Sequence, residues 1–456
     1  MLDQVYDEIA ISMEEKVNSL SNGYSSKCCI NKIPAFIRKG SEECYQPSVV
    51  SIGPIYYDHP SLKTIQDLKW IYLKNFLQHP SNDNPSLKDY TKFVRDHESA
   101  IYECFDLHNV GGKHDNNVEV TVHDPYRKCY EQHIVEQIRP DKFIEMMVLD
   151  AAFIVYLFIS NSDLDSSTIS IPKSQQGLVP YLVKDLFLLE NQLPFFVIQG
   201  FFDIAFGNPN DPPSKFIHII LNNLISITSF PGYKVMKRVV DNKEIIDAST
   251  TMHLLDLLRK CCCLHSNLSP INRESRKDKC YPRTAKKLSD NGVKFEVRES
   301  ECPLHITFKK GKLMIPEFVL DTDTEPYLRN LLYFEKCHYS EEDYINDNLL
   351  FLDKLIDTIE DVEVLQEAGI LLNHLGSDED AIKFFNNVPR NTTVGSHFHY
   401  SQVSKDANEY ASDCWNQSKA ILRNKYFHHP WAIISVIAAI ILFILSLLQT
   451  ISGFTK

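Results

Sequence analysis

Three acidic residues are the first candidates for chemistry in this sequence. Asp150, Glu190 and Glu335 each follow a run of large apolar residues. A carboxyl group among apolar side chains has a raised pKa and is suited to general acid or base catalysis. The alternative is structural: buried polar groups such as these and Asn191 cap helices and anchor loops inside a helical domain. A shared concave pocket would favour catalysis, and burial in separate places would favour the structural role.

The sequence lacks the motifs of common nucleotide, hydrolase and zinc sites. It contains no Gly-x-Gly-x-x-Gly, Gly-x-x-x-x-Gly-Lys, Gly-x-Ser-x-Gly or His-Glu-x-x-His, and its 12 cysteines form no Cys-x-x-Cys pair. Adjacent cysteines such as Cys261 and Cys262 point in different directions on a helix and chelate one metal poorly. We therefore predict no catalytic motif, no cofactor and no metal, and reduced thiols in a cytosol-facing protein.

Composition sets further bounds. The chain has 456 residues, 44% hydrophobic and 23% charged, which is typical of a globular protein with one large or two smaller packed units. Its formal net charge of −13 argues against nucleic acid as a partner, because phosphate binding requires a basic face.

Two apolar stretches, residues 141–159 and 179–198, resemble membrane spans until their charges are counted. Asp150 falls near the middle of the first stretch, and Lys184 falls within the second. Charges at these positions oppose insertion into lipid, so both stretches are expected to be buried inside the protein. Pro194 removes a helical hydrogen bond and predicts a break after Gln192, with a buried polar network beside it.

The remaining pattern is mainly helical, with a small amount of β structure. Residues 45–54 are predicted to be extended, because they are rich in β-branched residues and flanked by prolines. Short alternating runs predict a small antiparallel β meander at 293–316, with a hairpin at Lys309-Lys310-Gly311. The predicted fold class is therefore mainly α (α+β): a large helical domain with this meander.

The most apolar stretch begins at Trp431 and runs to Leu448 without a charged residue. As a helix it is about 27 Å long, close to the hydrocarbon thickness of a bilayer. We therefore predict one C-terminal transmembrane helix that contacts the lipid bilayer. The residues expected to face lipid are Trp431, Ile434, Ile437, Ile441, Phe443, Leu445 and Leu448.

The charges flanking this stretch bear on its orientation. Lys419, Arg423 and Lys425 precede it and only Lys456 follows it, which favours a cytoplasmic main domain. Glycosylation at the sequon of Asn391 would reverse that orientation. The predicted organisation is an N-terminal helix and linker, the helical domain, a juxtamembrane helix, the anchor and a short tail, at 1–28, 29–395, 396–430, 431–451 and 452–456.

An ordered set of motifs resembles one plant family. The motifs include Ser51-Ile-Gly-Pro54, the segment from Asp185 to Phe196 (Asp-Leu-Phe-Leu-Leu-Glu-Asn-Gln-Leu-Pro-Phe-Phe), Ile315-Pro-Glu-Phe-Val-Leu-Asp321 and Leu328-Arg-Asn-Leu-Leu-Tyr-Phe-Glu335. Together they are similar to the family catalogued as domain of unknown function 247, also called UPF0481, from about residue 30 to the C-terminus. Ala151-Ala152 departs from the family pattern, which places a glycine there.

This resemblance implies a plant membrane protein with a single C-terminal span, and the plasma membrane is the expected location. No enzymatic activity is established for the family, and some members are implicated in pollen self-incompatibility. We therefore expect a non-enzymatic interaction, recognition or signalling module with an unidentified protein partner. The alternative is a membrane-tethered enzyme that uses buried carboxylates. The sequence does not indicate the oligomeric state.

Overall fold

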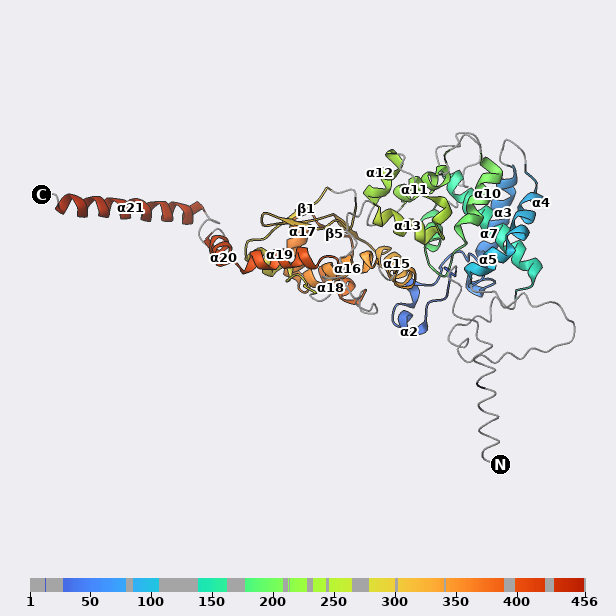
Figure 1. The fold of residues 1–456 in the computed structure, drawn as a ribbon, viewed down its shortest axis with the longest axis horizontal. Coiled ribbons are helices and arrows are strands. Elements are labelled where there is room, and N and C mark those ends of the chain that lie inside the picture. The colour runs from blue at the N-terminus through green and yellow to red at the C-terminus, as the bar shows by residue number, and fades with distance from the viewer. Residues whose placement is uncertain are drawn as a thin grey trace, which may run out of the picture. The chain divides into compact units, whose positions relative to one another are not determined.

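A computed structural model gives the fold of the chain (Figure 1). It divides the chain into two compact units: unit 1 comprises Met1–Thr228 and Met236–Lys260, and unit 2 comprises Ser229–Val235 and Cys261–Lys456. Two packed units are one of the two arrangements that the length of the chain allows. The described residues are 13, 28–78, 85–105, 138–161, 177–207, 212, 214–227, 233–242, 246–264, 279–299, 302–339, 342–388, 398–422 and 430–454.

Unit 1 is built around helix α7, Pro140–Ser160. Proline begins this helix at a position where a backbone N–H has no helical partner. Its apolar residues extend around the whole circumference and are buried by contacts with the other helices of the unit. Helices α3, α4, α10 and α11 contact it, with bounds Lys63–Gln78, Leu87–Asp96, Phe195–Phe206 and Lys215–Ile227.

Among the described residues, α7 is the one helix that passes a length and composition test for crossing a membrane, with a mean hydropathy of 2.0. Of the apolar window tested, 83% is buried inside the protein. The helix is therefore placed as a core helix, as its internal charges predicted.

The second apolar stretch is divided into two helices. Helix α9, Val179–Asp185, ends well before Pro194, and α10 begins directly after that proline. The break predicted at Gln192 is thus a longer non-helical turn over 186–194. The other helices of unit 1 are α2, α5, α12 and α13, with bounds Ala35–Arg38, Glu98–Cys104, Tyr233–Asp241 and Leu254–Cys263; α12 and α13 cross the division between the units.

Unit 2 contains a mixed sheet, so the predicted antiparallel meander is wrong. Strands β1 (Lys294–Val297), β2 (Thr307–Lys309) and β3 (Lys312–Ile315) lie in the order β1-β3-β2. β2 and β3 form the expected hairpin, and both Lys310 and Gly311 have the positive φ that its tight turn requires. β1 pairs parallel with β3, so β3 lies between the two strands that precede it in the chain.

A second, two-stranded parallel sheet joins β4 (Phe318–Leu320) to β5 (Leu371–Asn373). The helices of unit 2 before the C-terminal region are α14, α15, α16, α17 and α18, with bounds Ala285–Asp290, Thr324–His338, Tyr344–Leu355, Ile359–Glu367 and Asp378–Asn387.

The predicted juxtamembrane helix over 396–430 is not one helix. It contains α19 (Ser401–Ser412) and α20 (Cys414–Ile421), which are separated at Asp413. The Asp413 carboxylate accepts hydrogen bonds from the N–H groups of Trp415 and Asn416, so it ends one helix and caps the next. The N-terminal helix predicted within 1–28 lies almost wholly outside the described residues.

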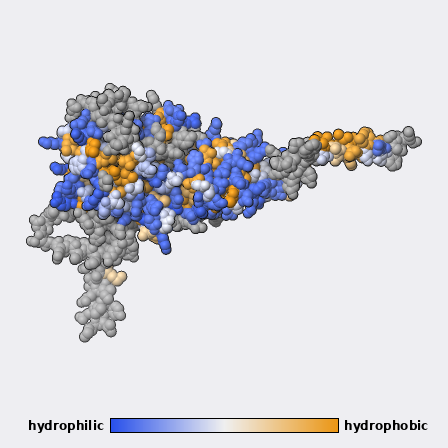
Figure 2. Space-filling view, turned by 180° about the vertical axis from the view of Figure 1, so that it is seen from behind, coloured by the Kyte–Doolittle hydropathy of each residue, from blue (hydrophilic) through white to orange (hydrophobic). Residues whose placement is uncertain are grey.

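Helix α21, Pro430–Phe454, ends the described chain and has 25 residues. Its described side chains are exposed, and Figure 2 shows hydrophobic residues along much of its length. Ile434, Ile437, Ile441, Phe443, Leu445 and Leu448 are 50% to 66% exposed. An apolar helix left exposed in this way contrasts with α7, whose apolar side chains are buried.

Candidate functional site

The segment predicted to be extended, 45–54, forms no strand, and its backbone is bound instead by polar side chains of unit 1. Buried N–H and C=O groups need partners, and most find them in a helix or sheet. Here the partners come from α3, α7, α9 and the turn that follows α9. We refer to residues 48–53 as the threaded segment and to the side chains that bind it as its cradle.

Asp185 is the main acceptor for the first half of the threaded segment. Its carboxylate accepts the N–H groups of Ser48 at 3.0 Å, Val49 at 2.6 Å and Val50 at 2.9 Å, together with the Ser48 hydroxyl. The carboxylate is presented at the C-terminal end of α9, where the chain leaves the helix. One side chain thus replaces a neighbouring strand as the acceptor for three backbone donors.

Asn191 continues the same pattern with both atoms of its amide. Its Oδ1 accepts the N–H of Ile52 at 2.6 Å, and its Nδ2 donates to the carbonyl of Val50 at 3.0 Å. The amide nitrogen also donates to the carbonyl of Asp185 at 2.9 Å, at the end of α9. Asn191 therefore joins the turn to the threaded segment and is fully buried.

Asp150 and Lys69 bind the second half of the threaded segment. Asp150 Oδ2 accepts the N–H of Gly53 at 2.8 Å, and its Oδ1 lies 2.5 Å from the Lys69 ammonium. The ammonium also donates to the carbonyl of Ser51. Both charged side chains are almost completely buried, so they form an ion pair whose hydrogen bonds are completed by the backbone.

Glu190 binds the chain on either side of the threaded segment. Its carboxylate accepts the N–H of Ile33 at 2.5 Å and the Tyr56 hydroxyl at 2.6 Å, and it pairs with both oxygens to the Arg38 guanidinium. Arg38 in turn donates through Nε to the carbonyl of Ile33 at 2.9 Å. Both contacts to the carboxylate come from one guanidinium nitrogen, Nη2, and they are charge-assisted hydrogen bonds.

The electrostatics of these acids follow from burial and from their partners. Burial raises the pKa of Glu190, and the Arg38 guanidinium and Tyr56 hydroxyl oppose that rise. Burial likewise raises the pKa of Asp150, and the Lys69 ammonium opposes it. Each carboxylate oxygen already has a donor within the protein. These contacts hold the backbone around the threaded segment in place.

Gln192 closes the turn between α9 and α10. Its Nε2 donates to the carbonyls of Leu186 at 2.6 Å and Leu188 at 2.8 Å, and its Oε1 accepts the N–H of Leu254 at 3.1 Å. These are carbonyls that a continuing helix would have satisfied. The buried polar network expected at the break before Pro194 is therefore present.

Gly53 packs closely against the backbone of Gln192, in the turn between α9 and α10. Its φ is +70°, and a Cβ atom placed on it would lie 2.6 Å from the carbonyl oxygen of Gln192. A side chain there is strained by the left-handed backbone and also collides with main-chain atoms. The close packing of the threaded segment against the turn thus requires glycine.

We expect Gly53→Ala to lower the free energy of unfolding of unit 1 by about 2 kcal/mol, from backbone strain and overpacking. Gly40→Ala is the control, because Gly40 also has a positive φ (+82°) but a Cβ there meets nothing within 4 Å. That control is expected to cost about 1 kcal/mol from strain alone. Denaturant unfolding of both variants checks this, and equal costs would show that the close approach is unimportant.

Glu335 belongs to unit 2. It is located on α15 and is fully buried, and its Oε2 accepts the N–H groups of Ile345 at 2.9 Å and Asn346 at 3.1 Å. These are unsatisfied donors in the first turn of α16. Glu335 is therefore a helix cap supplied by a neighbouring helix.

A second polar contact ties the start of α19 to α16. Asp347 Oδ2 accepts the backbone N–H of His399 at 2.7 Å and lies 2.6 Å from its Nδ1. The neighbouring Tyr400 hydroxyl donates to the carbonyl of Leu304 at 2.6 Å and accepts from the amide of Asn348. Among the described residues no group of three or more His, Cys, Asp or Glu side chains is arranged to hold a metal.

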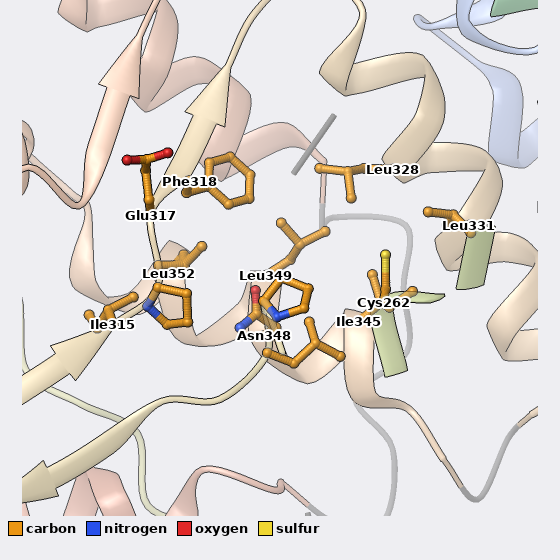
Figure 3. A pocket seen from close by; sticks show the side chains of 13 residues that line it. Cys262, Ile315, Glu317, Phe318, Leu328, Leu331, Ile345, Asn348, Leu349 and Leu352 are labelled. Atoms are coloured by element: carbon orange, nitrogen blue, oxygen red, sulfur yellow. The ribbon is translucent and has the colours of Figure 1, made fainter. Parts of the chain in front are cut away.

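Unit 2 also contains a small cavity with an accessible volume of about 30 Å³, enough for roughly one water molecule. Figure 3 shows side chains of α15, α16 and the β3–β4 segment converging on it, with the Glu317 carboxylate directed away. Burial raises the pKa of the Cys262 thiol, which lines the cavity, well above its usual value, and this disfavours the nucleophilic thiolate. A cavity of this size and lining is a packing gap rather than a substrate pocket.

The structure thus brings three of the four predicted polar positions together. Asp150, Glu190 and Asn191 bind one stretch of chain in unit 1, and Glu335 lies elsewhere. Sequence reasoning missed the partners Arg38, Tyr56, Lys69 and Asp185. Asp185 could have been identified from the sequence, because it lies in the same apolar stretch as Glu190. The other three have no local pattern that marks them.

Comparisons with known proteins agree with this arrangement of motifs. The family described as "Plant protein of unknown function" (domain of unknown function 247) matches residues 30–445. A UPF0481 protein of Arabidopsis thaliana is 27% identical over 459 residues, covering 96% of this chain and 88% of the relative. A putative UPF0481 protein of the same plant is 28% identical over 167 residues, covering 36% of this chain and 32% of the relative.

No solved structure matches the chain. The family match extends over both units and covers the threaded segment and every residue of its cradle. The chain therefore belongs to the plant family of domain of unknown function 247.

Proposed function

We propose that this protein is a single-pass membrane protein that is anchored by α21 and acts as a non-enzymatic interaction module. The observation that carries the proposal is the exposed apolar surface of α21. With 25 residues, this helix is about 37 Å long, which is enough to cross a hydrocarbon core of about 30 Å. Exposed isoleucine, leucine and phenylalanine along such a length are unfavourable in water and favourable in lipid.

The interaction role is supported by how the candidate catalytic residues are used. Asp150 and Glu190 bind the threaded segment and its flanks, and Glu335 caps a helix, so none of them is free for acid–base work. What remains for function is the surface of two packed units held at a membrane. We propose that this surface binds a protein partner in a recognition or signalling role.

The flanking charges favour a cytoplasmic location for both units. Lys419, Arg423 and Lys425 precede α21, and such cations are retained on the cytoplasmic side of a membrane. The sequons at Asn391 and Asn416 provide a test of orientation, since only lumenal or extracellular asparagines acquire glycans. A mobility shift after glycosidase treatment would place the units on the other side, and no shift is expected.

Membrane fractionation tests the anchor itself. The full chain is expected to stay in the membrane pellet during alkaline carbonate extraction. The double variant Ile441→Arg/Ile444→Arg is expected to move largely to the soluble fraction, because arginine at the centre of a spanning helix strongly opposes insertion. The matched control is Ile441→Leu/Ile444→Leu, which keeps the apolar surface. Pellet retention of the arginine variant would contradict the proposal.

Proximity labelling with the full chain tests the interaction role. The comparison is a protein in which residues 1–429 are replaced by an inert folded domain, so that only the anchor is retained. Partners specific to the full chain are expected. If both proteins label the same neighbours, the units have no partner of their own in that cell.

A further inference from the structure

Helix α20 has one face that is fixed to unit 2. Asn416 Nδ2 donates to the carbonyl of Tyr410 at 3.2 Å, and Gln417 Nε2 donates to the carbonyl of Ala411 at 2.9 Å. Ala420 is buried, and its Cβ would lie 3.4 Å from a Cβ built on Gly292. These contacts, together with the Asp413 cap, determine which side of α20 faces outward.

The outward face carries an unusual residue for an exposed position. Trp415 is 78% exposed, which is the highest value for a large hydrophobic side chain in the described part of the chain. Ser418 and Lys419 follow it by three and four positions and are exposed as well. Leu422, seven positions after Trp415, is 48% exposed. Residues at this spacing lie on one side of a helix.

The residue types on this face match the boundary between lipid headgroups and acyl chains. Tryptophan concentrates at that boundary because its ring is apolar and its indole N–H is polar. A lysine beside it reaches anionic headgroups, and a leucine adds apolar surface directed toward the acyl chains. The opposite face is occupied by contacts within unit 2, so the face with Trp415 is the one available to a membrane surface.

The covalent connection to α21 limits how far α20 can be from the bilayer. Seven residues, 423–429, separate Leu422 from Pro430. A fully extended chain over that interval spans at most about 29 Å. Two of the seven, Arg423 and Lys425, are cationic and add attraction to an anionic surface.

We propose that the outward face of α20, defined by Trp415, Lys419 and Leu422, lies in the headgroup region of the bilayer and docks unit 2 against the membrane. This inference rests on the proposed anchoring by α21 and adds a second contact with lipid. Its consequence is that the rest of unit 2 is held close to the membrane, because α20 contacts α19 through Asn416 and Gln417 and buries Ala420.

The chain has 3 tryptophans, at positions 70, 415 and 431, so each can be isolated as a fluorescent reporter by changing the other two to phenylalanine. The full-length variants are reconstituted into vesicles of phosphatidylcholine and phosphatidylserine, with and without bromine on the acyl chains near the headgroups. Bromine quenches only tryptophans at that depth. The Trp431 reporter tests the anchor, the Trp415 reporter tests α20, and the Trp70 reporter, on α3 of unit 1, is the water-exposed reference.

In brominated vesicles, the emission of the Trp415 reporter is expected to fall by about half, with a blue-shifted maximum, as for an interfacial tryptophan. Iodide in the water is expected to quench it less than the Trp70 reporter. Quenching of Trp431 but not Trp415 by bromine would overturn this inference and leave the anchor intact. Quenching of neither would overturn both. A Trp415 reporter protected from bromine and iodide alike would show a protein contact, through a partner or a second copy, and would also overturn it.

Discussion

Replacing Glu190 with glutamine is expected to lower the free energy of unfolding of unit 1 by about 3–5 kcal/mol, because it leaves a buried charge without its partner. Arg38 is 8% exposed and Glu190 is 1% exposed, so water does not replace the lost carboxylate. The carboxylate accepts hydrogen bonds from Arg38, Tyr56 and Ile33. Glutamine keeps one acceptor oxygen, but its NH₂ group takes the place of the other oxygen and cannot accept a hydrogen bond.

The measurement is denaturant unfolding followed by Trp70 fluorescence, in a Trp415→Phe/Trp431→Phe background where the signal comes from unit 1. The matched control is Asp141→Asn, which removes the exposed carboxylate paired with Arg139. The side chains of that pair are 61% and 72% exposed, so its loss is expected to change stability by about 0.5 kcal/mol or less. If Glu190→Gln lowers the free energy of unfolding as little as this control does, the structural role of Glu190 is contradicted.

A double-mutant cycle separates the pair from the rest of the site. Arg38→Met and Glu190→Gln, singly and together, give the coupling between the two side chains. The double variant is expected to be more stable than the sum of the single costs predicts, since neither partner then remains as an unpaired buried charge. Strict additivity would show that Glu190 acts through Ile33 and Tyr56 alone.

Asp185→Ala is the second change expected to have a large effect, at about 2–4 kcal/mol. It leaves the buried N–H of Val50 and the partly exposed N–H groups of Ser48 and Val49 without their acceptor, and a buried unsatisfied donor costs about 1–3 kcal/mol. Because Asp185 is 1% exposed, water has limited access to take its place. Loss of the contact is also expected to release the threaded segment, since its first half is bound mainly through this carboxylate.

Asp247→Ala is the comparison for Asp185, because Asp247 accepts the N–H of Ser249 at 2.9 Å at an exposed position. Solvent can replace that acceptor, so a cost of about 1 kcal/mol is expected, as for an ordinary helix cap. Amide hydrogen exchange at residues 48–50 checks the mechanism. Faster exchange there, but not in α7, is expected for Asp185→Ala; unchanged protection would show that the carboxylate is not what holds the segment.

Local sequence reasoning reached part of the site and missed the rest for a definite reason. Glu190 and Asn191 were selected because charged and amide groups in an apolar run must find partners, and Pro194 indicated where carbonyls would be freed. Arg38 and Lys69 were missed because an arginine or lysine beside apolar residues is ordinarily placed at the protein surface. Their pairing depends on contacts with residues 152 and 81 positions away, which no local pattern specifies.

The β structure gives a similar lesson. The Lys310-Gly311 turn was predictable, because a tight hairpin needs positive φ and glycine supplies it. The parallel pairing of β1 with β3 was not predictable. Short alternating runs indicate which residues form strands, but they do not indicate which strands pair. Likewise, residues 45–54 were β-prone in composition, yet the acceptors available to them in unit 1 are side chains.

By itself, the sequence determined that the protein is mainly helical, that it resembles the family to which it belongs, and that residues 141–159 are a buried core helix. Internal charges and apolar periodicity are local properties, and they suffice for those conclusions. Only the tertiary structure decided what the buried acids do. A carboxylate in an apolar run is equally compatible with a catalytic role and with a structural role until its hydrogen-bond donors are known. Here the donors of Asp150, Asp185 and Glu190 are mostly backbone N–H groups and buried cations, so the three acids hold one stretch of chain in place.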